Sequence, residues 1–514
     1  MSPRPRMQPF AFLARPLPRF VISVFLLLTL VFCSTRAEKA GDFAEYCLTT
    51  IALATHGTPY IEPADVARAI ALSPEDGYRG LFMSTYERMR TRERMPMPGL
   101  YLSNHGHYLA IHFFAYPALA ALPFRAFEAL GVDPFKAFQL VNYAPILALA
   151  AACYMLLGSH LRAALALTLF LLCGAVRYLN WGSPEVFTMA SLLAGLILCT
   201  LGRPIAAALL TGLAAMQNPP LIAFAVFAPA VRIGWLMVAE GLDRPSALRR
   251  VATLRSAVAF ALLVALALVP VLFSLWQFGE PSMIAKLATD TALVTPDRLG
   301  SFFFDPNQGT ILAFPAVLLL LAWLLWQRRA QRPLWHLGAA LGLSLALALP
   351  SLSTGNWNSG AAGPMRYAIW GGAPLLYLAL AWLSLERRWP PLLLGAVIAL
   401  QAGAMQHARS YNHLEFSPLG TWMLNQVPGW YDPDPELFYE RVVHSDGAVR
   451  EDGVIAYPDT RHPLKTLYNV HNPVAELTLC GPGRTLVTDN VVEMHQGWRY
   501  INGAPRCADS VPTP

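Results

Sequence analysis

The chain has 514 residues, of which 55% are hydrophobic and 14% are charged, with a formal net charge of +6 and a mean hydropathy of +0.42. Soluble globular domains carry roughly a quarter of charged residues, so this composition excludes an ordinary soluble protein, a disordered chain and a small disulfide-rich scaffold. The positive charge is not evidence of nucleic-acid binding, because in a membrane protein it first reports topology.

Leucine-rich and alanine-rich runs recur along the chain up to Gln406. They predict an all-α polytopic membrane protein with about 11–13 transmembrane helices. The first run, Phe20 to Cys33, follows a leader with four arginines. We interpret it as a retained span rather than a cleaved signal peptide, with the N-terminus in the cytoplasm.

Arginine clusters at 244–250, 328–332 and 387–388 mark cytoplasmic loops. The loops 279–309 and 353–366, together with everything after Gln406, are then expected on the opposite side. Counting every apolar run gives an even number of spans. A cytoplasmic N-terminus and a C-terminus on the opposite side require an odd number. One run within 108–179 is therefore expected to be a partial or re-entrant helix.

Two regions do not read as spans. The first outer loop, 34–106, is polar and contains amphipathic helix candidates at 43–55 and 64–72. The C-terminal region, 407–514, follows the membrane domain 1–406 and could form a small domain of undetermined type. Cys480 and Cys507 lie in this region, on the predicted oxidising side, where a disulfide and two free thiols are both open. The expected location is a bacterial inner membrane, with the C-terminal region in the periplasm.

Ionisable residues are scarce inside the predicted spans, whereas carboxylates gather in the outer loops. Because transporters normally place ionisable groups within their spans, this distribution favours chemistry at the membrane surface over passage through it. The sharpest feature is Gly41-Asp42-Phe43-Ala44-Glu45-Tyr46, just after the first span. Asp42 there could act as a general base on an acceptor hydroxyl. The same spacing also fits a capping box, with Asp42 as N-cap and Glu45 three residues on.

Gly41-Asp42 followed by Tyr46 and a hydrophobic helix resembles the "Gly-Asp-Glu-x-x-Tyr" opening of the C-type glycosyltransferases, in the bacterial branch with mannosyltransferases and aminoarabinose transferases. The resemblance implies a polytopic enzyme that takes a sugar from a polyprenyl-phosphate donor. It gives Asp42 the role of catalytic base or of activating the acceptor. Phe43 replaces the family's second acidic residue, and Glu45 could substitute for it.

Further stretches resemble the family in the same order. Tyr101 to His107 is similar to the motif before the second span, although Asn104, His105 and His107 stand where the family has lysine. The imidazoles could bind a donor phosphate or be interfacial histidines in water. Glu185, after Pro184, could orient the acceptor or bind a cation, or could simply favour the helix dipole at its position.

The last two similar stretches lie later in the chain. Ser301 to Gly309 resembles "Phe-Asp-Pro-x-x-Gly-Leu", with Asp305 and Asn307 as substrate-loop residues or as a helix-capping turn. Gly355 to Gly360 with Gly363 to Tyr367 resembles "Trp-x-Gly … Gly-Pro-Arg-Tyr". Asn356 then belongs to the substrate loop, and Arg366 either holds the donor phosphate or anchors an aromatic belt.

The expected function is therefore transfer of a sugar, with inversion, from a polyprenyl-phosphate donor to an unidentified glycan, lipid or protein acceptor at the periplasmic membrane face. Asp42, Glu45 and Glu185 are the catalytic candidates, and His105, His107 and Arg366 are the phosphate-binding candidates. Tyr46 is a substrate-loop candidate. No cofactor is required by the residues, although a divalent cation is compatible with them, and no nucleic-acid partner is expected. The alternative is a non-catalytic envelope lipid or polysaccharide transporter or assembly protein.

Overall fold

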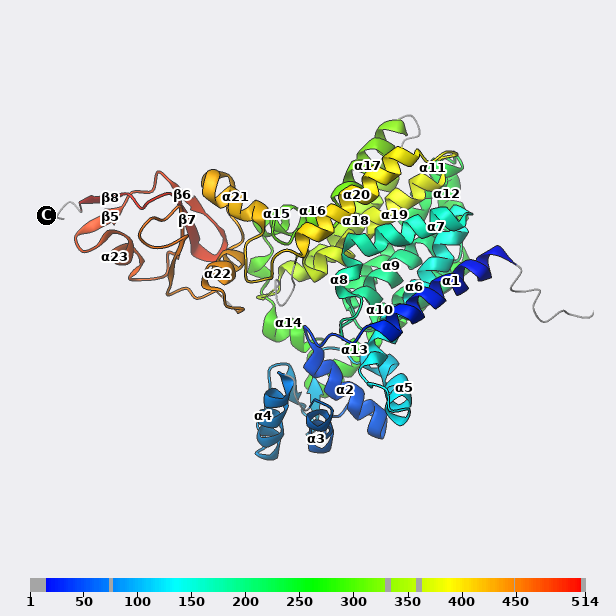
Figure 1. Cartoon of the computed structure of the whole chain (residues 1–514), viewed down its shortest axis with the longest axis horizontal. Helices are drawn as coiled ribbons and strands as arrows, with labels where there is room; N and C mark the ends of the chain where they lie inside the picture. The colour runs from blue at the N-terminus through cyan, green and yellow to red at the C-terminus, as the bar shows by residue number, and fades with distance from the viewer. Residues whose placement is uncertain (1–14, 74–76, 329–333, 357–362, 448, 510–514) are drawn as a thin grey trace, which may run out of the picture. The chain divides into compact units, whose positions relative to one another are not determined.

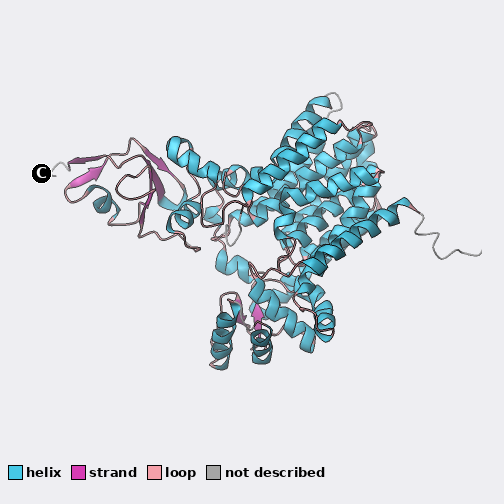
Figure 2. Ribbon diagram, in the orientation of Figure 1, coloured by secondary structure: helices cyan, strands magenta, loops and turns pink. Residues whose placement is uncertain are grey.

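The computed structural model describes residues 15–73, 77–328, 334–356, 363–447 and 449–509. They are mostly helical, and most of the strands lie in the C-terminal region, with a further pair in the first loop (Figure 2). The chain divides into two compact units. The first unit comprises Met1–Leu287, Ala316–Leu347 and Trp370–Ala399, and the second comprises Ala288–Pro315, Ala348–Ile369 and Leu400–Pro514. The predicted boundary at residue 406 therefore differs from the division by packing, which joins two of the expected outer loops to the C-terminal region.

Eight helices in the described part of the chain are long and apolar enough to cross a membrane (Figure 1). They are α1 (Pro16–Ser34), α6 (Lys136–Leu157), the run His160–Tyr178, the run Pro219–Ala239, α13 (Leu254–Phe278), α18 (Leu334–Leu352), α19 (Arg366–Ser384) and α20 (Pro391–Ala408). The run His160–Tyr178 contains α7 (His160–Phe170), η1 (Leu171–Ala175) and α8 (Val176–Tyr178). The run Pro219–Ala239 contains η2 (Pro219–Ala223) and α11 (Phe224–Ala239).

Three further apolar helices are shorter: α9 (Glu185–Thr200), α10 (Pro204–Ala215) and α17 (Pro315–Gln327). The chain is thus a multi-pass membrane protein, as the composition predicts, and the number of 11–13 spans stays a prediction. Within the stretch 108–179, the run expected at 108–130 is a strand followed by a 15-residue helix with an internal proline. At 1.5 Å per residue such a helix is too short to cross a bilayer.

The first unit is built around α9, whose residues are all buried and which packs against α6, α10 and α11. Local chemistry sets the helix limits. In α13, the Thr253 hydroxyl accepts from the Ser256 backbone N–H at the start, and Gly279 ends the helix at a φ of +73°. The short helix α12 (Arg244–Val251) precedes it and is capped by Asp243.

The first outer loop folds as three helices and a hairpin. Its elements are α2 (Phe43–His56), α3 (Pro63–Leu72), α4 (Tyr78–Arg90), β1 (Leu100–Leu102) and β2 (Tyr108–Ala110), followed by α5 (Ala115–Ala129). The predicted helices at 43–55 and 64–72 are confirmed, although α2 is buried along nearly its whole length instead of being amphipathic. The antiparallel pair β1–β2 brings Leu100 opposite Ala110.

The second unit carries the remaining elements. They are α14 (Met283–Ala288, which straddles the boundary), η3 (Thr291–Leu293), α15 (Pro296–Phe304), α16 (Thr310–Ala313), α21 (Pro418–Gln426), η5 (Pro428–Trp430), α22 (Pro435–Val443), β3 (Val454–Tyr457), β4 (Lys465–Asn469), α23 (Ala475–Cys480), β5 (Arg484–Leu486), β6 (Val491–Glu493), η6 (His495–Gly497), β7 (Trp498–Asn502) and β8 (Cys507–Asp509).

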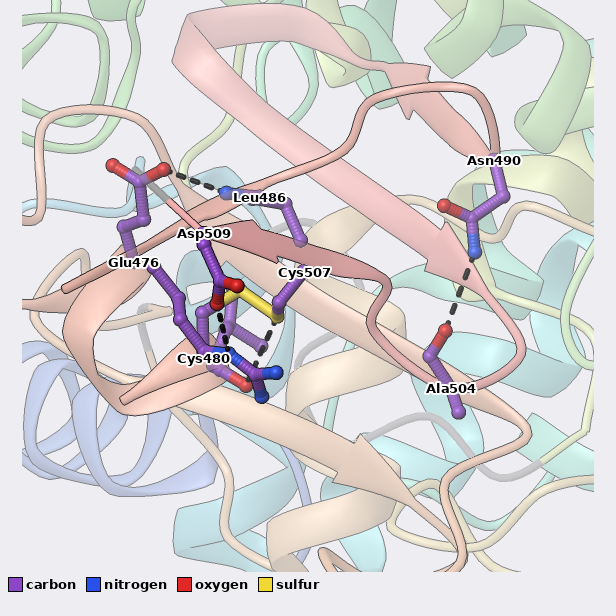
Figure 3. The surroundings of a disulfide bond; sticks show 9 residues. Glu476, Cys480, Leu486, Asn490, Ala504, Cys507 and Asp509 are labelled. Atoms are coloured by element: carbon purple, nitrogen blue, oxygen red, sulfur yellow. Dashed lines mark hydrogen bonds and ion pairs between the residues drawn. A yellow bond between two sulfur atoms is a disulfide. The ribbon is translucent and has the colours of Figure 1, made fainter. Parts of the chain in front are cut away.

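The C-terminal region is a small α+β fold. Its antiparallel sheet has the order β3-β4-β7-β6, and β5 pairs with β8. The buried side chains of Leu424, Phe438, Leu467, Trp498 and Tyr500 form its core. Cys480 and Cys507 form a disulfide that links α23 to β8 (Figure 3), which resolves the alternative that the sequence leaves open.

Candidate functional site

Asp42, Glu45 and His112 come together in the first unit, immediately after α1 and the short connection that follows it. Asp42 stands at the N-cap position of α2, Glu45 lies in the first turn of that helix, and His112 lies between β2 and α5. The imidazole lies between the two carboxylates. His112 Nδ1 is 2.9 Å from Glu45 Oε2, and His112 Nε2 is 3.4 Å from Asp42 Oδ2.

The β1–β2 hairpin positions His112. The Ile111 N–H donates to the Gly99 carbonyl at 2.8 Å, which extends the hairpin pairing to the residue before His112. The His112 N–H also faces Glu45 Oε2 at 3.4 Å. Gly99 has a φ of +83°, and a Cβ at this position would lie 2.0 Å from Glu45 Oε1. Glycine is therefore required here both by the backbone conformation and by the approach of the Glu45 carboxylate.

Burial separates the roles of the two carboxylates. Glu45 is buried, and this burial raises its pKa above the ordinary value, opposed by His112 and reinforced by the nearby Asp42 charge. The Asp42 side chain is 22% exposed, so a substrate hydroxyl can approach it. A buried carboxylate, an imidazole and a more accessible carboxylate in a row form an arrangement that can hold and transfer a proton.

The capping-box interpretation of this motif is wrong. The side chain of Asp42 makes no capping hydrogen bond at α2, and Glu45 is directed to His112 instead. A reciprocal capping box does occur in the same loop, at α3, where Glu62 and Asp65 cap each other's backbone N–H groups. The polar pair at the start of α2 is therefore not used for helix capping.

The same three residues could hold a divalent cation. One ligand atom from each of Asp42, Glu45 and His112 lies within 4.8 Å of the others. Imidazole nitrogen and carboxylate oxygen are common ligands of Zn²⁺ and Mn²⁺. A three-ligand site of this kind leaves a position for water or substrate.

Aromatic side chains connect this cluster to the predicted Glu185. Tyr46 is buried, with its ring 5.6 Å from the His112 ring and 5.6 Å from the Tyr116 ring. Glu185 is buried in the first turn of α9, and its charge adds to the effect of burial in raising the pKa of Tyr116. Glu185 therefore interacts electrostatically with this aromatic layer. Tyr46 packs in the site wall rather than in an open loop.

An apolar pocket adjoins His112. It is lined by side chains from α2, the hairpin, the connection to α5, and α13, including Thr49, Leu109, Phe114 and Phe273. A second groove, entirely apolar, lies among α5, α6, α9 and α10; its lining residues include Leu122, Leu140, Phe187 and Leu213. Phe187 contacts Tyr116 at a ring distance of 6.0 Å, so the groove and the site share this aromatic layer.

The predicted phosphate-binding histidines lie in the β1–β2 loop. His107 stacks on Tyr60 with ring centroids 4.1 Å apart, and His105 Nε2 is 3.0 Å from the Trp276 carbonyl. Asn104 donates its backbone N–H to the Gln277 carbonyl. These contacts fix the loop against the end of α13, and phosphate binding by the two histidines stays a prediction.

The remaining candidates belong to the second unit, and most of their polar groups have internal partners. Asp305 is buried and accepts from the Tyr431 hydroxyl, while Asn307 binds Asp305 and accepts from the Ser417 N–H. Asn356 donates to Asp446. Arg366 is buried at the start of α19, with its guanidinium over the Tyr367 ring. Residues 357–360 of the predicted "Trp-x-Gly" stretch lie outside the described residues.

His112 is the site residue that the sequence analysis missed. It stands in Ile111-His112-Phe113, within a stretch assigned to an apolar span. Its isolation among apolar residues was the available signal, but the hairpin that returns it to α2 has strands of three residues each. Strands this short leave little periodicity in a sequence.

The fold and the site define a multi-pass membrane protein with a carboxylate–imidazole–carboxylate cluster in its first loop. Comparisons of the chain with protein-family models, with characterised proteins and with solved structures find no match.

Proposed function

We propose that the chain is an inverting membrane glycosyltransferase that moves a sugar from a polyprenyl-phosphate donor to an acceptor at the periplasmic face. The observation that carries the proposal is the Asp42–His112–Glu45 cluster. It lies directly after the first apolar helix, where the sequence resemblance expects the catalytic base. Sequence order and geometry thus support the same residue, Asp42.

In the proposed reaction, Asp42 takes the proton of the acceptor hydroxyl as its oxygen attacks the anomeric carbon. The bond between that carbon and the phosphate oxygen breaks, and polyprenyl phosphate leaves. With Glu45 ionised, the Nδ1–H of His112 donates to it, so that Nε2 can receive the proton from Asp42. Glu45 then stabilises the resulting imidazolium, as the acidic member of a catalytic triad does.

The apolar features of the first unit support a lipid-linked donor. The pocket beside His112 is lined largely by apolar side chains. The groove among α5, α6, α9 and α10 would accommodate part of a polyprenyl chain. The leaving phosphate needs positive charge or hydrogen-bond donors as its own charge develops. His105 and His107, in the same unit as Asp42, are the proposed residues for that role. Arg366, to which the sequence resemblance gives the same role, belongs to the second unit.

The test uses the full-length protein in lipid nanodiscs with a panel of polyprenyl-phosphate-linked hexoses and pentoses, and measures release of polyprenyl phosphate. We expect Asp42→Asn to lower the rate by about 10²–10⁴-fold, the range typical of losing a general base. His112→Asn should lower it in the same direction. Glu87→Gln is the matched control, because Glu87 is an exposed carboxylate on α4 of the same loop.

A second measurement identifies the donor. Cells that lack the protein should accumulate one polyprenyl-phosphate sugar, and the wild-type gene should clear it whereas Asp42→Asn should not. Normal clearance by Asp42→Asn, or its unchanged activity in nanodiscs, would exclude Asp42 as the base.

A further inference from the structure

The C-terminal region contains an uncharged segment with large exposed apolar side chains. Residues 416–431, which include α21 and η5, contain no Asp, Glu, Lys, Arg or His. Leu419 is 46% exposed, Trp422 is 55% exposed and Trp430 is 84% exposed. Leu419 and Trp422 are three residues apart on α21, so they share one face of the helix.

The start of this segment is fixed close to the ends of two apolar helices. Ser417, which caps α21, donates its N–H to Asn307 Oδ1 and its hydroxyl to the Pro306 carbonyl, both at 2.8 Å. Tyr411 donates to the Asn307 carbonyl at 2.5 Å. The helix α20 ends at Ala408, shortly before Tyr411, and α17 begins at Pro315, shortly after the 305–307 loop. A short chain can span only a few ångströms per residue, so α21 begins close to the last residue of α20 and to the first residue of α17.

The other end of the segment returns to the same loop. The Tyr431 hydroxyl donates to Asp305 Oδ2 at 2.9 Å, and Asn307 Nδ2 contacts the same hydroxyl. Trp430 directly precedes this anchored tyrosine. Phe304, directly before Asp305, is itself 68% exposed. Both ends of the uncharged segment are therefore held to the loop that leads into α17.

We propose that residues 416–431 form an interfacial anchor, in which Leu419, Trp422 and Trp430 insert into the lipid headgroup and acyl boundary of the membrane. Tryptophan favours this boundary because its ring is apolar and its indole N–H is polar. The absence of charge removes the main cost of insertion. The anchor would hold the C-terminal region against the bilayer that α20 has just crossed.

The experiment places an environment-sensitive fluorophore on single introduced cysteines in the full-length protein, reconstituted in phosphatidylcholine nanodiscs. The variants are Trp422→Cys, Trp430→Cys and the control Leu477→Cys. Leu477 is 54% exposed on α23 of the same unit and lies outside the segment. The unsubstituted protein, labelled in the same way, gives the contribution of the native exposed Cys33.

We expect the labels at 422 and 430 to emit at shorter wavelength than the label at 477. Lipids with a spin label in the upper acyl chain should quench them, because an interfacial helix inserts its apolar face about 5–10 Å. Equal quenching at 477, or no lipid quenching at 422 and 430, would overturn the proposal. If the shift to shorter wavelength at 422 and 430 depends on protein concentration, a second copy of the chain or a protein partner covers the segment. That result would also overturn the proposal.

Discussion

His112 Nδ1 lies 2.9 Å from the carboxylate of Glu45, although the two residues are 67 positions apart in the chain. The second nitrogen of the same ring faces Asp42 at 3.4 Å. A single imidazole therefore joins a buried carboxylate to a more accessible one. A proton and a metal ion would compete for the same nitrogen and oxygen lone pairs of these three side chains. Proton transfer and metal binding can therefore be tested separately, by pH and by added zinc.

The first prediction concerns pH and Glu45. Burial raises the pKa of Glu45 in the folded protein above its ordinary value. Between the ordinary and the raised value, the unfolded chain has released this proton and the folded chain still holds it. The free energy of unfolding should therefore fall as pH rises through this window. Glu45→Gln should remove that slope in thermal unfolding measured at a series of pH values.

The same carboxylate should limit the reaction. Because the proposed proton transfer needs ionised Glu45, sugar transfer should be lost as pH falls through the raised pKa, above the range of an exposed glutamate. This role would be contradicted if sugar transfer were lost only in the pH range of an exposed glutamate. It would also be contradicted if Glu45→Gln had the same pH dependence of thermal unfolding as the wild type.

The second prediction concerns zinc. Zn²⁺ bound by Asp42, Glu45 and His112 would take the atoms that the proposed proton transfer uses. Added Zn²⁺ should therefore inhibit polyprenyl phosphate release, and a chelator should restore it. Zinc binding, measured by calorimetry, should be lost in His112→Asn and kept in His56→Asn, where His56 pairs instead with Asp65. If a chelator abolishes the activity and Mn²⁺ restores it, a cation-dependent reaction replaces the proton transfer.

The third prediction concerns Gly99. A Cβ at this position would lie 2.0 Å from Glu45 Oε1, and the residue has a φ of +83°. Gly99→Ala should therefore displace the Glu45 carboxylate and lower sugar transfer, in addition to a backbone cost of about 1–2 kcal/mol. Gly57→Ala is the control, since Gly57 has a φ of +73° with no neighbour within 4 Å of an added Cβ. Equal transfer rates in the two variants would show that the position of Glu45 does not matter.

The sequence predicted the features that depend on local pattern. Apolar runs gave the long helices, and the polar loop gave α2 and α3 with nearly correct limits. The Asp42–Glu45 motif was also visible. The sequence could not show which contacts these two side chains make. A capping box and a catalytic pair have the same spacing, and only the distant partner His112 distinguishes them.

The side-chain contacts within the second unit could not be predicted from the sequence for a related reason. Asp305 and Asn307 were expected either in the substrate loop or in a helix-capping turn, and their side chains bind Tyr431 and Ser417, more than a hundred positions later in the chain. A conspicuous polar turn before an apolar helix is equally suited to either use. Long-range pairing of this kind leaves no local periodicity.

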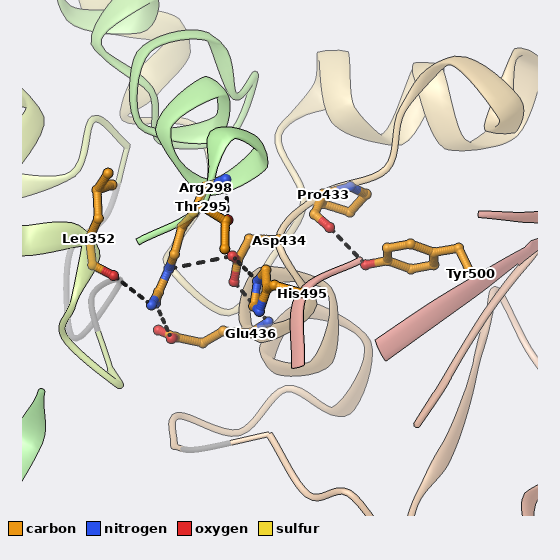
Figure 4. A network of polar contacts seen from close by, with 8 residues as sticks. All are labelled: Thr295, Arg298, Leu352, Pro433, Asp434, Glu436, His495 and Tyr500. Carbon is orange, nitrogen blue, oxygen red and sulfur yellow. Dashed lines mark hydrogen bonds and ion pairs between the residues drawn. The ribbon is translucent and has the colours of Figure 1, made fainter. Parts of the chain in front are cut away.

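The fourth prediction concerns a buried cluster of charged side chains that connects separate segments of the second unit. Arg298 on α15 is 1% exposed and donates to Glu436 at 3.0 Å and to the Leu352 carbonyl at 2.8 Å (Figure 4). Its Nε lies 3.4 Å from Asp434, which also binds His495. Burial opposes the ionisation of Asp434 most strongly, yet Arg298 and His495 together hold the pKa of its carboxyl below the ordinary value.

Arg298→Met should therefore destabilise the second unit strongly, because it removes the cation that Glu436 and Asp434 share and leaves Asp434 with His495 alone. The cost of removing one partner from such a cluster is about 3–5 kcal/mol. Limited proteolysis of the C-terminal region against temperature measures the effect in the full-length protein. Arg450→Met, which breaks the exposed pair of Arg450 with Asp452, should leave the midpoint unchanged. Similar midpoints for both variants would mean that the buried Arg298 is replaceable, and that packing in the core of the C-terminal region holds the unit together instead.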